Sequence, residues 1–121
     1  PFGFLGFEPF PRLRELILDA SQAEGARVIA YHAIGHIAKT WLQARAECGS
    51  FLNEQLVKDE SVGLNGAIFE ALIMGVGVTD LSDTMIDLIA KGRVPADFGT
   101  VEDVKASIAE SQELAKALGV V

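Results

Sequence analysis

The amino-acid sequence predicts an all-α fold, a compact bundle of five to six helices with one long central helix (about residues 21–48) and an irregular N-terminal arm. Half of the 121 residues are hydrophobic but only 7% are aromatic. This mixture, mostly Ala, Leu, Ile and Val, favours helices over sheets, because short and unbranched side chains lose little rotamer freedom in a helix. Apolar residues recur at helical spacing and no strand or hairpin pattern is present. One helical domain over residues 1–121 is therefore expected.

The chain begins with PFGFLGFEPFP, which we interpret as an irregular arm over residues 1–11. Prolines restrict helix formation in this segment, and its glycines loosen the backbone. Pro11 suits the first turn of a helix. The helical bundle is expected over residues 12–118, and its first helix is RLRELILDA (12–20).

The second helix is expected to be the longest. Ser21 followed by Glu24 has the form of a capping box, and Gly49 after Cys48 is a plausible C-terminal stop. A helix between these signals would be about 40 Å long. Gly25 and Gly35 lie inside it, and each weakens it. A glycine retained inside a helix often marks the close approach of another helix.

Four further helices are expected, each after a residue that can cap its N-terminus. They are residues 51–60 after Ser50, 66–74 after Asn65, 80–91 after Thr79 or Asp80, and 101–118 after Thr100. Thr100 with Asp103 repeats the capping-box pattern. The segment GVGV ends the fourth of the six helices, and Gly92 follows the fifth.

Charge and composition exclude some classes of function. The formal net charge is −7, from 17 acidic and 10 basic residues, and the basic residues form no cluster. Nucleic-acid binding and binding to an anionic membrane surface both need clustered cations, so neither partner is expected. The single cysteine cannot form an intrachain disulfide, and the N-terminal residues lack a signal-peptide pattern. A cytoplasmic location is therefore expected.

His32 and His36 are the only histidines, and they lie four positions apart. On a helix this spacing places both imidazoles on one face, within reach of one metal ion or cofactor. A helical wheel puts the pair on the polar side of the long helix. Two interpretations stay open: exposed or interfacial histidines, or half of a transition-metal or cofactor site. Further ligands would come from Glu54, Glu70 or a second copy of the chain.

Two other residues are candidates for chemistry. Cys48 falls on the apolar side near a helix C-terminus, where a thiolate is not favoured, so we interpret it as a core residue. Glu70 is the one charge in the apolar segment SVGLNGAIFEALIMGVGVT. It lies either on the solvent face of its helix or in an apolar pocket, where it could act as an acid or base. No nucleophile elbow or phosphate-binding loop is present.

The arm carries four phenylalanines in ten residues: Phe2, Phe4, Phe7 and Phe10. They either pack onto their own bundle or anchor in a groove of a partner, since aromatic side chains dominate interface energetics. The mean hydropathy of +0.30 is high for a small domain. Surplus apolar content indicates that part of the surface meets another chain.

No motif is specific enough to assign a family, and the sequence leaves open whether the protein is an enzyme. It favours a small acidic cytoplasmic helical protein that acts through assembly, as a homo-oligomer or an accessory subunit of a larger complex. Docking would use the arm and the apolar region 62–78. The alternative is a metal- or cofactor-binding helical protein, including an enzyme, that uses His32 and His36.

Overall fold

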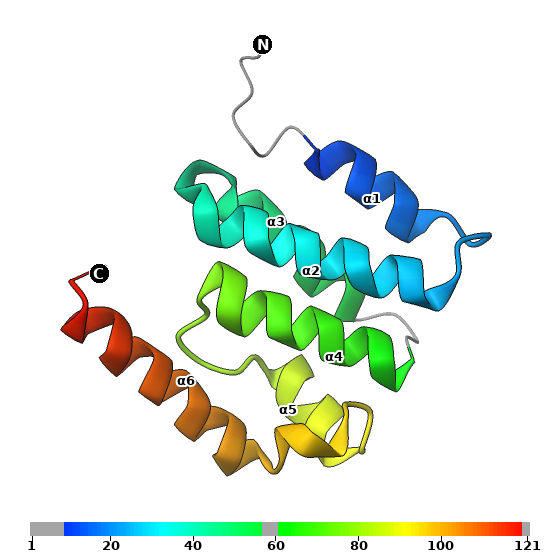
Figure 1. Cartoon of the computed structure of the whole chain (residues 1–121). Coiled ribbons are helices and arrows are strands. Elements are labelled where there is room, and N and C mark those ends of the chain that lie inside the picture. Colours follow the sequence, from blue (N-terminus) through cyan, green and yellow to red (C-terminus); the bar gives the residue numbers. More distant parts are fainter. Residues whose placement is uncertain (1–8, 57–60, 120–121) are drawn as a thin grey trace.

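The computed structural model describes residues 9–56 and 61–119, and these residues form an all-α fold (Figure 1). The α-helices are α1 (Phe10–Leu18), α2 (Glu24–Thr40), α3 (Arg45–Leu56), α4 (Val62–Glu70), α5 (Asp83–Ala90) and α6 (Val101–Ala117). Shorter helices are η1 (Leu42–Ala44), the π-helix η2 (Ala71–Val76) and η3 (Ala96–Phe98). Within the described ranges no strand is present, so the predicted fold class is confirmed. None of these helices combines the length and apolar character needed to span a bilayer.

Helix α2 is the central element of the bundle. It packs against α1, α3, α4 and η2, and α1 and α4 lie on opposite sides of it (Figure 1). Helices α5 and α6 lie beyond α4, on the side away from α1. The largest fully buried side chains come from several of these helices: Ile17, Tyr31, Ile34, Leu52, Ile68, Phe69, Leu72 and Met85. One continuous core thus runs between α2 and the helices around it.

The single helix expected over 21–48 is two helices. Helix α2 ends at Thr40, and Trp41 has an extended backbone with φ −119° and ψ 100°. The chain then turns through η1 into α3, where Nε of Arg45 donates a hydrogen bond of 3.1 Å to the carbonyl oxygen of Ala38. The apolar periodicity continues across this turn because α3 faces the same core as α2. Periodicity alone does not distinguish these two arrangements.

The expected helix starts are correct in part. The capping box of Thr100 and Asp103 is present at the start of α6. Ser21 does not cap α2; its amide and hydroxyl donate hydrogen bonds to Asp19, and Ala23 is the N-cap residue. Helices α4 and α5 are capped instead by serines, Ser61 and Ser82. Asn65 and Ser50 lie inside helices rather than before them, and Gly49 lies inside α3.

Helices α2 and η2 meet through two glycines. A Cβ placed on Gly75 would lie 2.6 Å from Cα of Gly35, and one placed on Gly35 would lie 2.9 Å from Cα of Ala71. Both distances are far below van der Waals contact, so the two backbones touch. The prediction that Gly35 marks the close approach of another helix is confirmed. For Gly25, in the first turn of α2, the same prediction is wrong, since no neighbour lies within 4 Å of such a Cβ.

We predict that Gly75→Ala lowers the free energy of unfolding by about 2 kcal/mol or more, because the added methyl group meets backbone atoms that cannot rotate away. Urea denaturation followed by far-UV circular dichroism measures the effect. The matched control is Gly25→Ala, which adds a methyl group to an open helical position and should stabilise the protein by up to about 1 kcal/mol. Equal stability of Gly75→Ala and the wild type would contradict the packing described here.

Candidate functional site

His32 and His36 both lie on the exposed face of α2, as the helical wheel predicts. Together with Glu70 of α4 they border a small pocket of about 110 Å³. Residues of η2 form its other side, and π-helical turns occur frequently at functional sites. The structure therefore brings the histidine pair next to Glu70. Glu54 lies on α3 and borders neither this pocket nor the larger cleft beside it.

The ligand set for a metal is incomplete within one chain. Among the described residues, no three His, Cys, Asp or Glu side chains are grouped so that they could hold a metal ion. His32 and His36 would supply two ligands, and a tetrahedral site needs more. A metal at this position would require movement of Glu70 or ligands from another chain.

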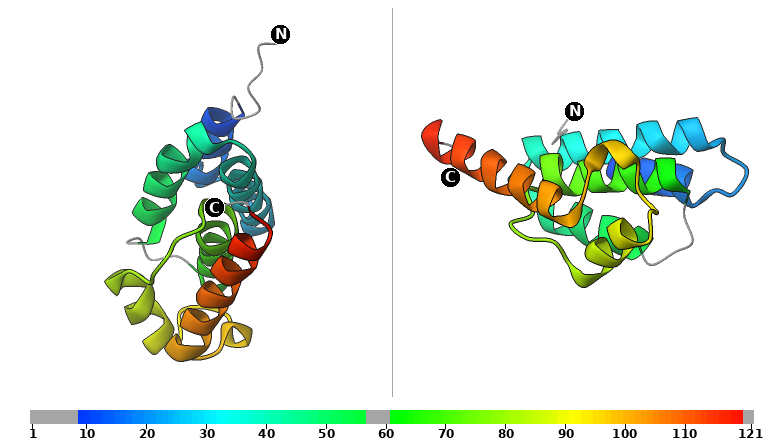
Figure 2. Two further views of the ribbon diagram at one scale, coloured as in Figure 1. Left: turned by 90° about the vertical axis from the view of Figure 1, so that its left-hand side faces the viewer. Right: turned by 90° about the horizontal axis from the view of Figure 1, so that it is seen from below.

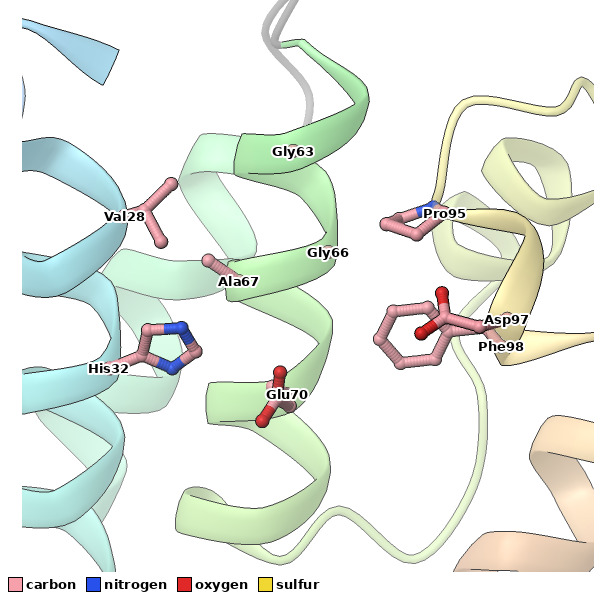
Figure 3. Close-up of a pocket in the computed structure, with 9 residues that line it drawn as sticks. All are labelled: Val28, His32, Gly63, Gly66, Ala67, Glu70, Pro95, Asp97 and Phe98. Atoms are coloured by element: carbon pink, nitrogen blue, oxygen red, sulfur yellow. The ribbon is translucent and has the colours of Figure 1, made fainter. Parts of the chain in front are cut away.

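A larger cleft of about 450 Å³ adjoins the histidine pair (Figure 3). Its first wall comes from α2, its floor from α4 and its second wall from the loop that contains η3. The lining residues are Val28, His32, Gly63, Gly66, Ala67, Glu70, Pro95, Asp97 and Phe98. His32 extends from one wall, and Asp97 and Phe98 face it from the other (Figure 3).

The floor of the cleft follows from the sequence of α4. Gly63, Gly66, Ala67 and Glu70 are spaced i, i+3, i+4 and i+7, which places them on one face of a helix. Three of the four are small, so this face is low between its two walls. Glu70 is exposed at the end of the row. Of the two alternatives for Glu70, the structure therefore supports the position on the solvent face of its helix.

Three contacts fix the second wall against α4. Nδ2 of Asn65 donates a hydrogen bond of 2.8 Å to the carbonyl oxygen of Arg93. A Cβ on Gly66 would lie 2.7 Å from Cγ of Pro95, so the glycine lets the proline ring reach the helix backbone. The rings of Phe69 and Phe98 meet edge to face, with centroids 5.8 Å apart. These contacts hold the wall in place without a ligand.

The described lining residues of the cleft include two carboxylates, one histidine and no lysine or arginine. Glu70 and Asp97 are exposed at its rim. A Cβ placed on Gly63 would lie 2.9 Å from Oε2 of Glu24, so a third carboxylate stands at that end of the floor. Asp97 and Phe98 are cleft residues that the sequence pattern does not predict, because nothing in the loop RVPADFG indicates which helix it covers.

The structure places the one described phenylalanine of the arm in the core. Phe10 begins α1, is 2% exposed and packs edge to face on Phe51 of α3, with ring centroids 5.9 Å apart. The guanidinium group of Arg14 lies over both rings. For Phe10, the interpretation that the side chain packs onto its own bundle is therefore correct, and binding of Phe10 to a partner is not supported. Phe2, Phe4 and Phe7 lie outside the described residues.

The end of α6 extends beyond the other helices (Figure 2). Val104 and Ile108, in the first half of α6, are buried against the bundle. Leu114 and Leu118, near its end, are 60% and 69% exposed. Other large exposed apolar residues lie on other elements of the fold: Leu18, Ile29, Leu42, Val62 and Met74. The end of α6 thus presents two leucines one turn apart on a projecting helix.

Cys48 is buried in the core, as predicted, but it lies in the first turn of α3 and not near a helix C-terminus. Burial, with a smaller contribution from the negative charge of Glu47, raises the pKa of its thiol to about 11. Since the thiolate is the reactive form, this cysteine is a poor nucleophile.

We predict that Cys48 reacts with Ellman's reagent at pH 8 at least about 100-fold more slowly in the native protein than in urea. Burial limits the access of the reagent, and the raised pKa lowers the fraction of thiolate. Stopped-flow absorbance measures both rates. Comparable rates in the two states would mean that Cys48 is accessible and ionised.

No protein-family model, curated protein or solved structure matches the chain. The function is therefore argued from the geometry of these surfaces alone.

Proposed function

We propose that this acidic helical protein acts through assembly, as a homo-oligomer formed by the projecting end of α6. The observation that supports the proposal is the exposure of Leu114 and Leu118 beyond the bundle. Large apolar side chains at adjacent turns of a helix form a typical helix-packing surface. A cytoplasmic location, inferred from the single cysteine, belongs to the same proposal.

A second copy of the chain fits this surface for two reasons. Helix packing around a two-fold axis brings the same patch of each copy together, so the two leucines of one copy meet those of the other. The same two turns carry charges of both signs, Glu113 and Lys116. Although the whole chain has a net charge of −7, this segment can therefore approach its own copy with little repulsion.

We predict that the Leu114→Gln/Leu118→Gln double variant weakens self-association by about tenfold or more, because each change replaces apolar contact area with a group that must be desolvated. Sedimentation velocity over a range of protein concentrations measures the dissociation constant. Glutamine is a good helix former, so α6 itself should persist.

The matched control is Leu18→Gln, which changes a leucine that is 53% exposed on α1, away from α6. It should leave the dissociation constant unchanged. A monomeric wild-type protein at every concentration, or equal effects of the α1 and α6 variants, would contradict the proposal. Removal of residues 1–8 tests the contribution of the arm, and the deletion must spare Phe10 because it belongs to the core.

The second candidate function is metal or cofactor binding by His32 and His36. The observation in its favour is that Glu70, a further donor, borders the same pocket as both imidazoles. The nitrogens of imidazole and a carboxylate oxygen are ligands that zinc and other transition metals accept. Coordination by a second copy would complete the site, so this function is compatible with assembly.

We predict, for this second candidate, that untagged protein dialysed against Zn²⁺ retains the metal in a fixed ratio to the chain. His32→Ala and His36→Ala should each abolish retention, since a single remaining imidazole cannot chelate the metal. Elemental analysis after gel filtration gives the ratio, and Glu54→Gln is the control on a carboxylate outside the pocket. Retention of zinc by both histidine variants would exclude the pair as ligands.

A further inference from the structure

The geometry points to the cleft between α2, α4 and η3 as a binding site for a small organic cation, an ammonium group attached to an apolar body. This inference is independent of assembly through α6. It rests on the size of the cleft, the rigidity of its walls and the distribution of charge around it.

Size and lining suit a small molecule. The cleft volume of about 450 Å³ lies within the range usual for ligand pockets, which combine apolar walls with a few polar groups. The apolar part consists of Val28 on α2, Ala67 on the floor and the ring of Phe98 on the opposite wall. An apolar body of about the size of one aromatic ring can lie on this floor against Phe98.

The walls are held in place before a ligand binds. Pro95 rests on the backbone of α4 at Gly66, and Phe98 is fixed by Phe69. The loop is tied to α4 once more by the hydrogen bond from Asn65. Because the site is preformed, little conformational entropy of its own residues is lost when a ligand binds.

Charge selects the class of ligand. Glu70 and Asp97 stand on two different elements at the rim, and Glu24 lies at the end of the floor. No lysine or arginine is among the described residues that line the cleft, and His32 is their one basic side chain. Phe98 adds an aromatic ring, whose face attracts a cation. A bare metal ion fits less well, since no metal-holding group of donors exists in the described part of the chain.

Three probes separate the contributions of charge and apolar contact: phenethylammonium, its neutral analogue 2-phenylethanol, and methylammonium, which lacks the apolar body. Each is titrated into ¹⁵N-labelled full-length protein in buffer with EDTA, and amide shifts are followed by NMR. We predict that phenethylammonium gives saturable shifts at residues 63–70 and 95–98. The other two probes should bind at least about fivefold more weakly, because each keeps only one of the two interactions.

Glu70→Gln and Asp97→Asn should each weaken phenethylammonium binding by about two- to fivefold, the effect expected of a partly exposed ion pair. Both substitutions keep the shape of the side chain, so the fold is preserved. Glu113→Gln, on the far end of α6, is the control for the loss of one negative charge elsewhere and should leave affinity unchanged. Equal binding of the neutral analogue, undiminished binding by both cleft variants, or shifts confined to other surfaces would overturn the inference.

Discussion

The arrangement of the molecule depends on the close contact of α2 with η2. Gly35 and Gly75 let two backbones touch where any side chain would hold them apart. This contact sets the distance between α2 and the continuous helix formed by α4 and η2. The fully buried side chains Ile34, Ile68 and Leu72 fill the space that remains on the core side. On the outer side, the same distance places His32 and His36 beside Glu70.

The same use of small residues forms the outer surface of α4. Gly66 admits Pro95, and Gly63 and Ala67 leave a low floor between α2 and the loop at 95–98. In the core, missing side chains shorten the distance between helices and strengthen packing. At the surface, they leave a space that the walls do not fill. The cleft is thus a consequence of the small residues that allow α4 to pack closely against α2 and against the loop at 95–98.

Assembly and binding of an organic cation are proposed for separate parts of the molecule. Assembly is assigned to the end of α6, which projects because only its first half is anchored by Val104 and Ile108. Ligand binding is assigned to the cleft between α2 and α4, on the rigid part of the bundle. Each can therefore be tested by variants that leave the other surface intact. His32 borders the cleft, and both histidines border the smaller pocket beside it. A metal bound by the pair would need additional ligands.

The sequence by itself determined the all-α class, the capping box at Thr100, the exposure of the histidine pair and the burial of Cys48. All of these follow from composition, local hydrogen bonding or helical periodicity within one segment. Only the tertiary structure decided that the chain turns at Trp41 and that Phe10 belongs to the core. It also decided that Asp97 lines the same cleft as His32 and Glu70. Those features depend on contacts between distant segments, and one helix period cannot specify which helix lies opposite another.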